Sequence, residues 1–160
     1  DGCIVHFDTF MTGEVFAVLS EHSILGRTQQ RGASFDGEAF DRGVQVALST
    51  DGEIGPLSTL FSARSLGLTG ELSATAQADY LSGLLIGHEL SALACVQRRR
   101  RNSVHLPSII LIGNSQLCSR YSRALDACGF ARVTLAEQAT ERGLWQLALA
   151  AGLISPTPHR

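Results

Sequence analysis

The residues best suited to binding chemistry follow an apolar run in the second half of the chain. Residues 109–112 are four consecutive aliphatic residues, a pattern typical of a strand buried on both faces. Gly113, Asn114 and Ser115 follow and open a segment of helical spacing that includes Leu117. A strand that enters a helix in this way presents free backbone N–H groups, which suit a phosphate or the ribose and adenine of a nucleotide. The same residues also describe an ordinary turn with a helix cap, and spacing alone favours that simpler interpretation.

A second candidate site lies at residues 8–14, whose sequence is D-T-F-M-T-G-E. Residues 3–11 alternate between apolar and polar side chains, which predicts a strand, and Thr12 and Gly13 break this pattern before a helix. Carboxylate and hydroxyl groups at such a junction could bind a metal–nucleotide or line a cleft. The structural alternative is that Thr12 caps the helix and Glu14 stabilises its first turn.

The third candidate is S-G-L-L-I-G-H-E at residues 82–89. Gly83 and Gly87 are four residues apart and share one helical face, although each glycine costs about 1 kcal/mol relative to alanine in a helix. Close packing of another backbone or the approach of a ligand would offset that cost, and packing is the more conservative explanation. His88 and Glu89 are adjacent and point in different directions, so we predict no metal site formed by protein ligands.

The elements that must position these residues follow from hydrophobic spacing. We predict helices over residues 14–23, 35–48, 57–66 and 73–101, and another that begins at Ser115 and ends before Gly129. Residues 132–135 form a further strand and residues 139–153 a final helix, with loops at 26–34 and 67–70 and a turn at Asp51 and Gly52. This order predicts an α/β domain over residues 1–154 and a flexible tail over residues 155–160.

Composition excludes several classes of protein. A formal net charge of −2 gives no general attraction to nucleic acid, and the four arginines at residues 98–101 are typical of a solvated helix end. No apolar run approaches the roughly 20 residues that cross a bilayer, and the four cysteines form no C-x-x-C pair. We therefore expect a cytoplasmic protein with buried free thiols. The only methionine is Met11, and Asp1-Gly2 is a favoured hairpin turn, so we expect a piece of a longer protein.

Several stretches together resemble the sugar-acid kinase family of 2-dehydro-3-deoxygalactonokinase over nearly the whole chain. They are I-V-H-F-D-T-F-M-T-G-E (4–14), E-H-S-I-L-G (21–26), F-D-R-G-V (40–44), L-F-S-A-R (60–64), Y-L-S-G-L-L-I-G-H-E (80–89), I-L-I-G-N-S-Q-L-C-S-R-Y (110–121) and E-R-G-L-W (141–145). Each motif is weak alone, but their order and separations make the match specific. The resemblance implies the C-terminal lobe of an actin-like, ribonuclease H-like ATPase domain, with a mixed sheet flanked by helices. It also implies phosphorylation of 2-dehydro-3-deoxy-D-galactonate by ATP, with Mg²⁺ bound through the nucleotide.

The resemblance also suggests roles for the candidate residues. Gly113, Asn114, Ser115 and Leu117 would lie at the adenosine turn. The cleft would be bordered by Met11, Thr12, Gly13 and Glu14 on the phosphate side and by Ser82, Gly83 and Gly87 on a helix. The catalytic residues are expected upstream of Asp1, so the chain alone would be inactive until it meets the N-terminal lobe of the same protein.

The expected partners are therefore a sugar acid, ATP and that lobe, with no nucleic acid and no membrane, and homo-oligomers are conceivable because the isolated lobe exposes an interface. The alternative is a non-catalytic nucleotide-binding or interaction module that keeps the lobe fold. A Gly-rich phosphate loop in the sequence upstream would favour the kinase. A third hypothesis is a regulator that contacts DNA through residues 98–101. It would need a helix-turn-helix pattern, and the sequence shows none.

Overall fold

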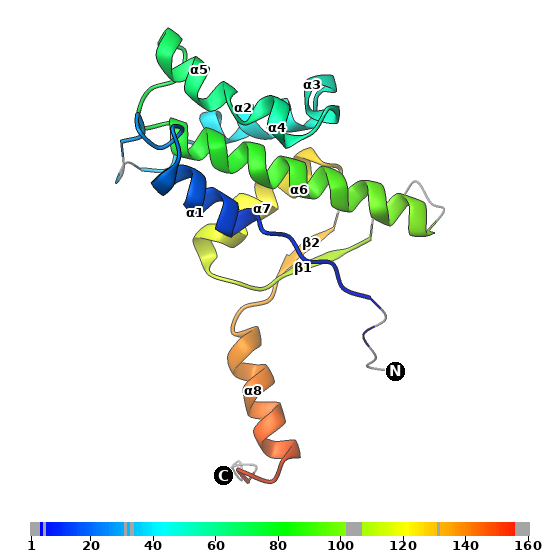
Figure 1. The fold of residues 1–160 in the computed structure, drawn as a ribbon. Helices are drawn as coiled ribbons and strands as arrows, with labels where there is room; N and C mark the ends of the chain where they lie inside the picture. The colour runs from blue at the N-terminus through cyan, green and yellow to red at the C-terminus, as the bar shows by residue number, and fades with distance from the viewer. Residues whose placement is uncertain are drawn as a thin grey trace.

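Helices dominate the chain, and two short strands form a small sheet (Figure 1). The computed structural model describes residue 4 and residues 6–30, 32, 34–101, 107–130 and 132–155. The elements in chain order are α1 (Thr12–His22), α2 (Gly37–Leu48), α3 (Thr50–Glu53), α4 (Pro56–Thr59), α5 (Ser62–Thr69), α6 (Gln77–Arg101), β1 (Ile109–Leu111), α7 (Ser115–Ala127), β2 (Val133–Leu135) and α8 (Ala139–Ala150).

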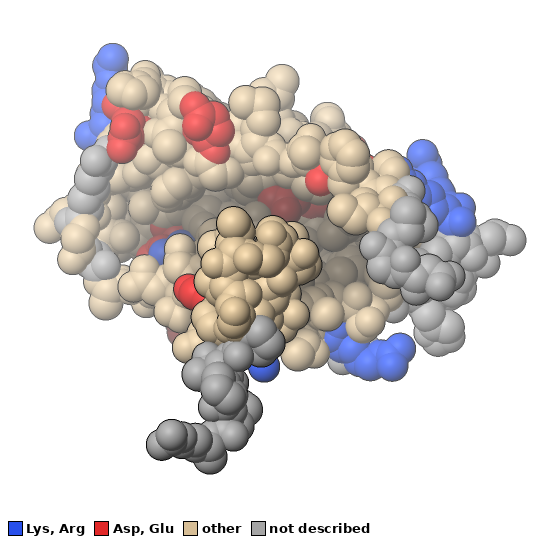
Figure 2. Space-filling view, turned by 90° about the horizontal axis from the view of Figure 1, so that it is seen from below, with Lys and Arg blue, Asp and Glu red and all other residues tan. Residues whose placement is uncertain are grey.

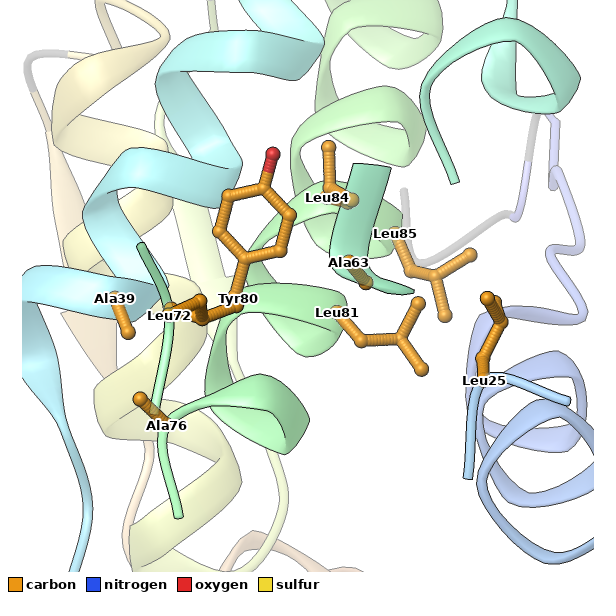
Figure 3. Close-up of a cluster of buried hydrophobic side chains, with 9 residues drawn as sticks. All are labelled: Leu25, Ala39, Ala63, Leu72, Ala76, Tyr80, Leu81, Leu84 and Leu85. Atoms are coloured by element: carbon orange, nitrogen blue, oxygen red, sulfur yellow. The ribbon is translucent and has the colours of Figure 1, made fainter. Parts of the chain in front are cut away.

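The long helix α6 is the centre of the fold, and α2 packs along it. Two hydrophobic clusters form along α6. The first contains Tyr80, Leu81 and Leu84, all at most 1% exposed, and residues from α2, α5 and the loops pack around them (Figure 3). The second joins the far half of α6 to α2, α7 and the sheet, and its fully buried members include Phe40 and Ala124. Both clusters therefore depend on the position of α6.

Glycines set the distance between α2 and α6. A Cβ atom at Gly83 would overlap the backbone carbonyl of Phe40, and one at Gly43 would overlap the carbonyl of Tyr80. A Cβ at Gly87 would lie 2.7 Å from the Cβ of Ala47. The two backbones are thus in direct contact, which accounts for the two α6 glycines by packing.

The sheet consists of β1 and β2, which run parallel with Ile109 opposite Val133 and Leu111 opposite Leu135. Helix α7 connects them, and it begins where the Asn114 side chain accepts a hydrogen bond of 2.8 Å from the Leu117 N–H. It ends at Ala127, and two residues later Gly129 has a φ of +82°, the left-handed conformation that glycine adopts without strain. Ile109, Leu111 and Val133 pack against the cluster formed by α6 and α7.

Most predicted elements are confirmed, since seven of the expected helices and strands occur within a few residues of their predicted bounds: α1, α2, α6, β1, α7, β2 and α8. A helix-dominated α/β fold is therefore observed. Among the described residues the sheet is purely parallel, so the mixed sheet is not seen. Cys118 is buried as expected, whereas Cys95 is exposed, and both are free thiols. No helix in the described part of the chain is long and apolar enough to cross a membrane.

Four local predictions are wrong. The turn predicted at Asp51 and Gly52 lies within the short helix α3. Residue 4 and residues 6–11 form no strand, because no neighbouring strand among the described residues supplies hydrogen bonds; residues 1–3 and 5 lie outside the described chain. The helix predicted at 57–66 is divided into α4 and α5, and α5 continues through the predicted loop to Thr69. The strand at 109–112 is not buried on both faces, since Ile110 is 66% exposed. Of the tail predicted at residues 155–160, residues 156–160 lie outside the described chain.

The glycine contact leads to a stability prediction. Gly83→Ala forces a methyl group against the Phe40 carbonyl, and overpacking of this kind costs about 1–3 kcal/mol. The matched control is Gly143→Ala in α8, where a Cβ meets no atom within 4 Å and alanine should stabilise the helix by up to about 1 kcal/mol. Urea unfolding of both variants measures the difference. Equal stability of Gly83→Ala and the parent chain would show that the two helices are not in backbone contact.

Candidate functional site

A groove of about 240 Å³ lies between the N-terminus of α1, the N-terminal half of α6 and the first half of α7. Four of the residues proposed from the sequence line it together, although they come from three separate motifs: Thr12, Gly13, Ser82 and Leu117. The remaining lining residues are Phe16, Leu85, Ile86, Arg120 and Tyr121. The fold therefore joins three candidate sites into one.

The lining is mainly apolar, with a few polar groups at its ends. Phe16, Leu85, Ile86 and Leu117 supply the apolar walls. This combination is typical of sites for small organic ligands, whose volumes are usually about 300–1,000 Å³. The groove lies just below that range, so it suits one part of a ligand rather than the whole of a large one.

Glu89 of α6 joins the two other helices at the groove. Its Oε2 accepts a hydrogen bond of 2.5 Å from the Thr12 hydroxyl and one of 2.7 Å from the Tyr121 hydroxyl. Burial and the hydrogen bond and charge of Glu89 raise the pKa of Tyr121 well above its ordinary value, so this side chain stays a donor. One carboxylate thus fixes the N-terminus of α1 and the middle of α7 against α6.

Arg120 is held in place at the groove by a second carboxylate of α6. Its Nη2 lies 2.7 Å from Oδ1 of the buried Asp79. The other Asp79 oxygen accepts a hydrogen bond of 2.8 Å from the Asp36 N–H, just before α2. The guanidinium also lies over the Phe35 ring, 4.5 Å from its centroid. Arg120 keeps 26% of its side chain exposed, so a fixed donor group faces the groove while Asp79 balances its charge.

The remaining residues of the Gly113 motif lie outside the lining of this groove. Asn114 is the N-cap of α7, which agrees with the simpler interpretation of the turn. Gly113 is exposed, and Ser115 lines a wider open groove of about 710 Å³ beside β2. The turn still affects the groove, because the Asn114 side chain accepts the hydrogen bond that fixes the backbone of Leu117, a lining residue.

The other proposed residues are placed as follows. Met11 is 70% exposed and precedes α1, and Glu14 is exposed in the first turn of that helix. Gly83 and Gly87 face α2, so packing accounts for them, and of the three α6 residues proposed from the sequence Ser82 is the one that lines the groove. His88 and Glu89 diverge as predicted, since the His88 ring bonds to Thr59 and not to the groove.

Sequence reasoning assigned no site role to Arg120, Tyr121 or Glu89. A signal was present, because Leu117, Arg120 and Tyr121 are spaced i, i+3, i+4 and must share one face of a helix. No comparable spacing in the sequence indicates Asp79 and Glu89, the α6 residues that bind Arg120 and Tyr121. In the part of the chain that the structure describes, no three His, Cys, Asp or Glu residues are grouped to hold a metal ion.

Taken together, these features define a helix-dominated α/β domain with a mainly apolar groove that residues of three candidate motifs line. The model of the 2-keto-3-deoxy-galactonokinase family matches residues 1–147. The chain therefore belongs to this family.

Individual relatives agree with the family match. The chain is 32% identical over 126 residues to the 2-dehydro-3-deoxygalactonokinase of Escherichia coli (strain K12). It is 34% identical over 155 residues to a Rhizobium meliloti (strain 1021) protein assigned to the same activity. A crystal structure from Sinorhizobium meliloti, also assigned to that activity, superimposes with a TM-score of 0.76 at 28% identity and covers 93% of this chain.

The chain is much shorter than these relatives. The alignments cover 77% and 94% of this chain but only 39% and 47% of the Escherichia coli and Rhizobium proteins. The matched part of the Sinorhizobium structure is 48% of that chain. The sequence thus spans about half the length of the relatives it matches.

The hydrogen bonds of Glu89 lead to a pH prediction. Because the pKa of Tyr121 is raised in the folded state, unfolding releases its proton more readily, and stability should fall as pH rises above the ordinary tyrosine value of 10.0. Tyr121→Phe removes this group, so its stability should be lower at neutral pH but should fall less above pH 10. Urea unfolding across that pH range tests this. Parallel stability curves for the two proteins would show that folding does not raise the pKa of Tyr121.

Proposed function

We propose that the chain is the C-terminal, nucleotide-side lobe of an ATP-dependent kinase that phosphorylates 2-dehydro-3-deoxy-D-galactonate to its 6-phosphate. The lobe, residues 1–154, would have the actin-like ATPase fold. Membership of the family supports this proposal, as do the names of the two relatives. The observation that carries it is the groove that unites Thr12, Gly13, Ser82 and Leu117.

The chemistry of the groove suits a nucleotide. A flat base would lie between the apolar walls, with the hydroxyl of Ser82 and the guanidinium of Arg120 as hydrogen-bonding groups. The phosphates would lie toward the N-terminus of α1, where no side chain caps the helix and the positive end of its dipole attracts anions. The turn at Gly113 to Ser115 would act through Leu117 and border the adenosine.

The groove does not contain the parts that transfer a phosphoryl group. In-line transfer needs a positioned nucleophile, a group to accept its proton and stabilisation of the phosphate charge. Asp8 is a poor base, because hydrogen bonds from His6 and the nearby Arg100 lower the pKa of its carboxyl group. Glu89 is committed to Thr12 and Tyr121. The catalytic residues would therefore belong to the remaining half of the family's length, and Mg²⁺ would be held through the nucleotide phosphates.

Calorimetric titration of the 160-residue chain with ADP and ATP, with and without Mg²⁺, tests the proposed site. We expect weak binding, because a partial site makes fewer contacts. Gly13→Trp should weaken it at least tenfold, since Gly13 is an exposed residue at the groove and an indole there would fill the space.

The matched control is Val18→Trp, which adds the same ring to an exposed position of α1 away from the groove lining. It should bind nucleotide as the parent chain does. Equal binding by Gly13→Trp and the parent chain would place the nucleotide elsewhere. Binding of the sugar acid alone, with no response to nucleotide, would contradict the assignment of the groove.

A further inference from the structure

A second chamber adjoins the groove at Phe16 and Arg120, which line both spaces. The chamber has a volume of about 360 Å³ and lies between the C-terminal half of α1, the loop that follows that helix and the start of α6. The groove alone suits one part of a ligand, so the chamber offers room for a further part of the same molecule.

Two side chains that line the chamber carry a buried polar atom without a hydrogen-bond partner. The atoms are Oγ of Ser20 and Nε2 of Gln29, and no other side-chain atom in the described part of the chain shares this condition. Buried polar groups in native proteins are nearly always hydrogen-bonded, so exceptions need an explanation. Because both exceptions line one chamber, they point to a ligand that supplies the missing partners.

Backbone contacts hold these two side chains in place. A Cβ atom at Gly26 would overlap the Ser20 carbonyl, so this glycine lets the loop fold back against α1. The Gln29 N–H donates a hydrogen bond of 3.2 Å to the Gly26 carbonyl. The next residue, Gln30, donates its N–H to the Ala74 carbonyl at 2.8 Å. The backbone that carries the Gln29 amide is thus tied both to the loop after α1 and to the segment before α6.

The charges of the lining disfavour an anionic group in the chamber. The lining contains two carboxylates, Glu21 and Asp79, and one cation, Arg120, which lies 2.7 Å from Asp79. Seen from below in Figure 2, the hollowed face of the molecule is likewise mostly uncharged. A neutral part of a ligand therefore suits the chamber better than a phosphate does.

The two unpartnered atoms match the edge of an adenine base. Nε2 of Gln29 is a hydrogen-bond donor, whereas the Ser20 hydroxyl can donate or accept. Adenine presents a ring nitrogen that accepts beside an amino group that donates, and a glutamine amide is a common partner for this edge. Phe16 lines both spaces, so a base on this ring could extend from the groove into the chamber.

We propose that Gln29 and Ser20 select the base of the nucleotide. The base lies against Phe16, the Gln29 amide donates to a ring nitrogen of adenine, and the Ser20 hydroxyl accepts from the adenine amino group. Ser20 is seven residues beyond Gly13, about 10 Å along α1, so the edge of the base and the phosphates lie at opposite ends of the site. The inference rests on the proposed function in which the groove binds a nucleotide.

Gln29→Leu tests the proposal in titrations with ADP and UDP. It removes the unpartnered donor, so ADP should bind about tenfold more weakly, which is the effect of one lost hydrogen bond. The smaller pyrimidine of UDP does not extend into the chamber, so UDP binding should stay as in the parent chain. The urea midpoint of the ligand-free variant should rise, because an unsatisfied buried atom is gone. A glutamine with a purely structural role would give a lower midpoint.

The matched control is Gln45→Leu, the same change at an exposed position of α2 outside both linings, and it should bind ADP as the parent chain does. Ser20→Ala should also weaken ADP binding and leave UDP binding unchanged. Undiminished ADP binding by Gln29→Leu, or a lower urea midpoint, would overturn the proposal. If Gly13→Trp still abolished ADP binding in that case, the groove assignment would stand alone. A parent chain that binds neither nucleotide would overturn both.

Discussion

The backbone contact between α2 and α6 is the constraint on which the rest of the structure depends. Gly43, Gly83 and Gly87 allow the two helices to approach until main-chain atoms touch. With larger residues the helices would move apart, and both hydrophobic clusters would lose their close packing, since α6 contributes to each of them. The groove depends on the same contact, because Ser82, Leu85 and Ile86 are its α6 wall and lie beside the two α6 glycines.

Two carboxylates on α6 then determine where the smaller helices lie. Asp79 and Glu89 are ten residues apart, which separates them by about 15 Å along the helix. Asp79 binds Arg120 and the backbone before α2, and Glu89 binds α1 and α7. Apolar packing alone would tolerate small rotations of α7, whereas these directional bonds fix which of its residues face the groove. The shape of the groove is thus specified by polar contacts built on an apolar frame.

The sequence predicts the structural features that local patterns determine. It does not predict features that depend on contacts between residues far apart in the chain. The periodicity of residues 73–101, the cap at Asn114 and the glycine after α7 are local signals, and the structure confirms them. The alternation of residues 3–11 is a local signal for a strand, but a strand needs a neighbouring strand, and the only strands paired in the described chain are β1 and β2. Arg120 illustrates the same limit at the site, because only the fold shows that Asp79 holds it over Phe35.

The groove and the sheet both illustrate this difference between local signals and distant contacts. Each follows from local rules, and each is incomplete in the part of the chain that the structure describes. The groove is smaller than a typical ligand site and contains no group suited to accept a proton. The sheet has one face packed on helices and one edge with hydrogen-bonding groups directed outward at Ile110. Helix α7 links the two, because Leu117, Arg120 and Tyr121 line the groove while Ala124 and Leu125 lie in the cluster against which β1 packs.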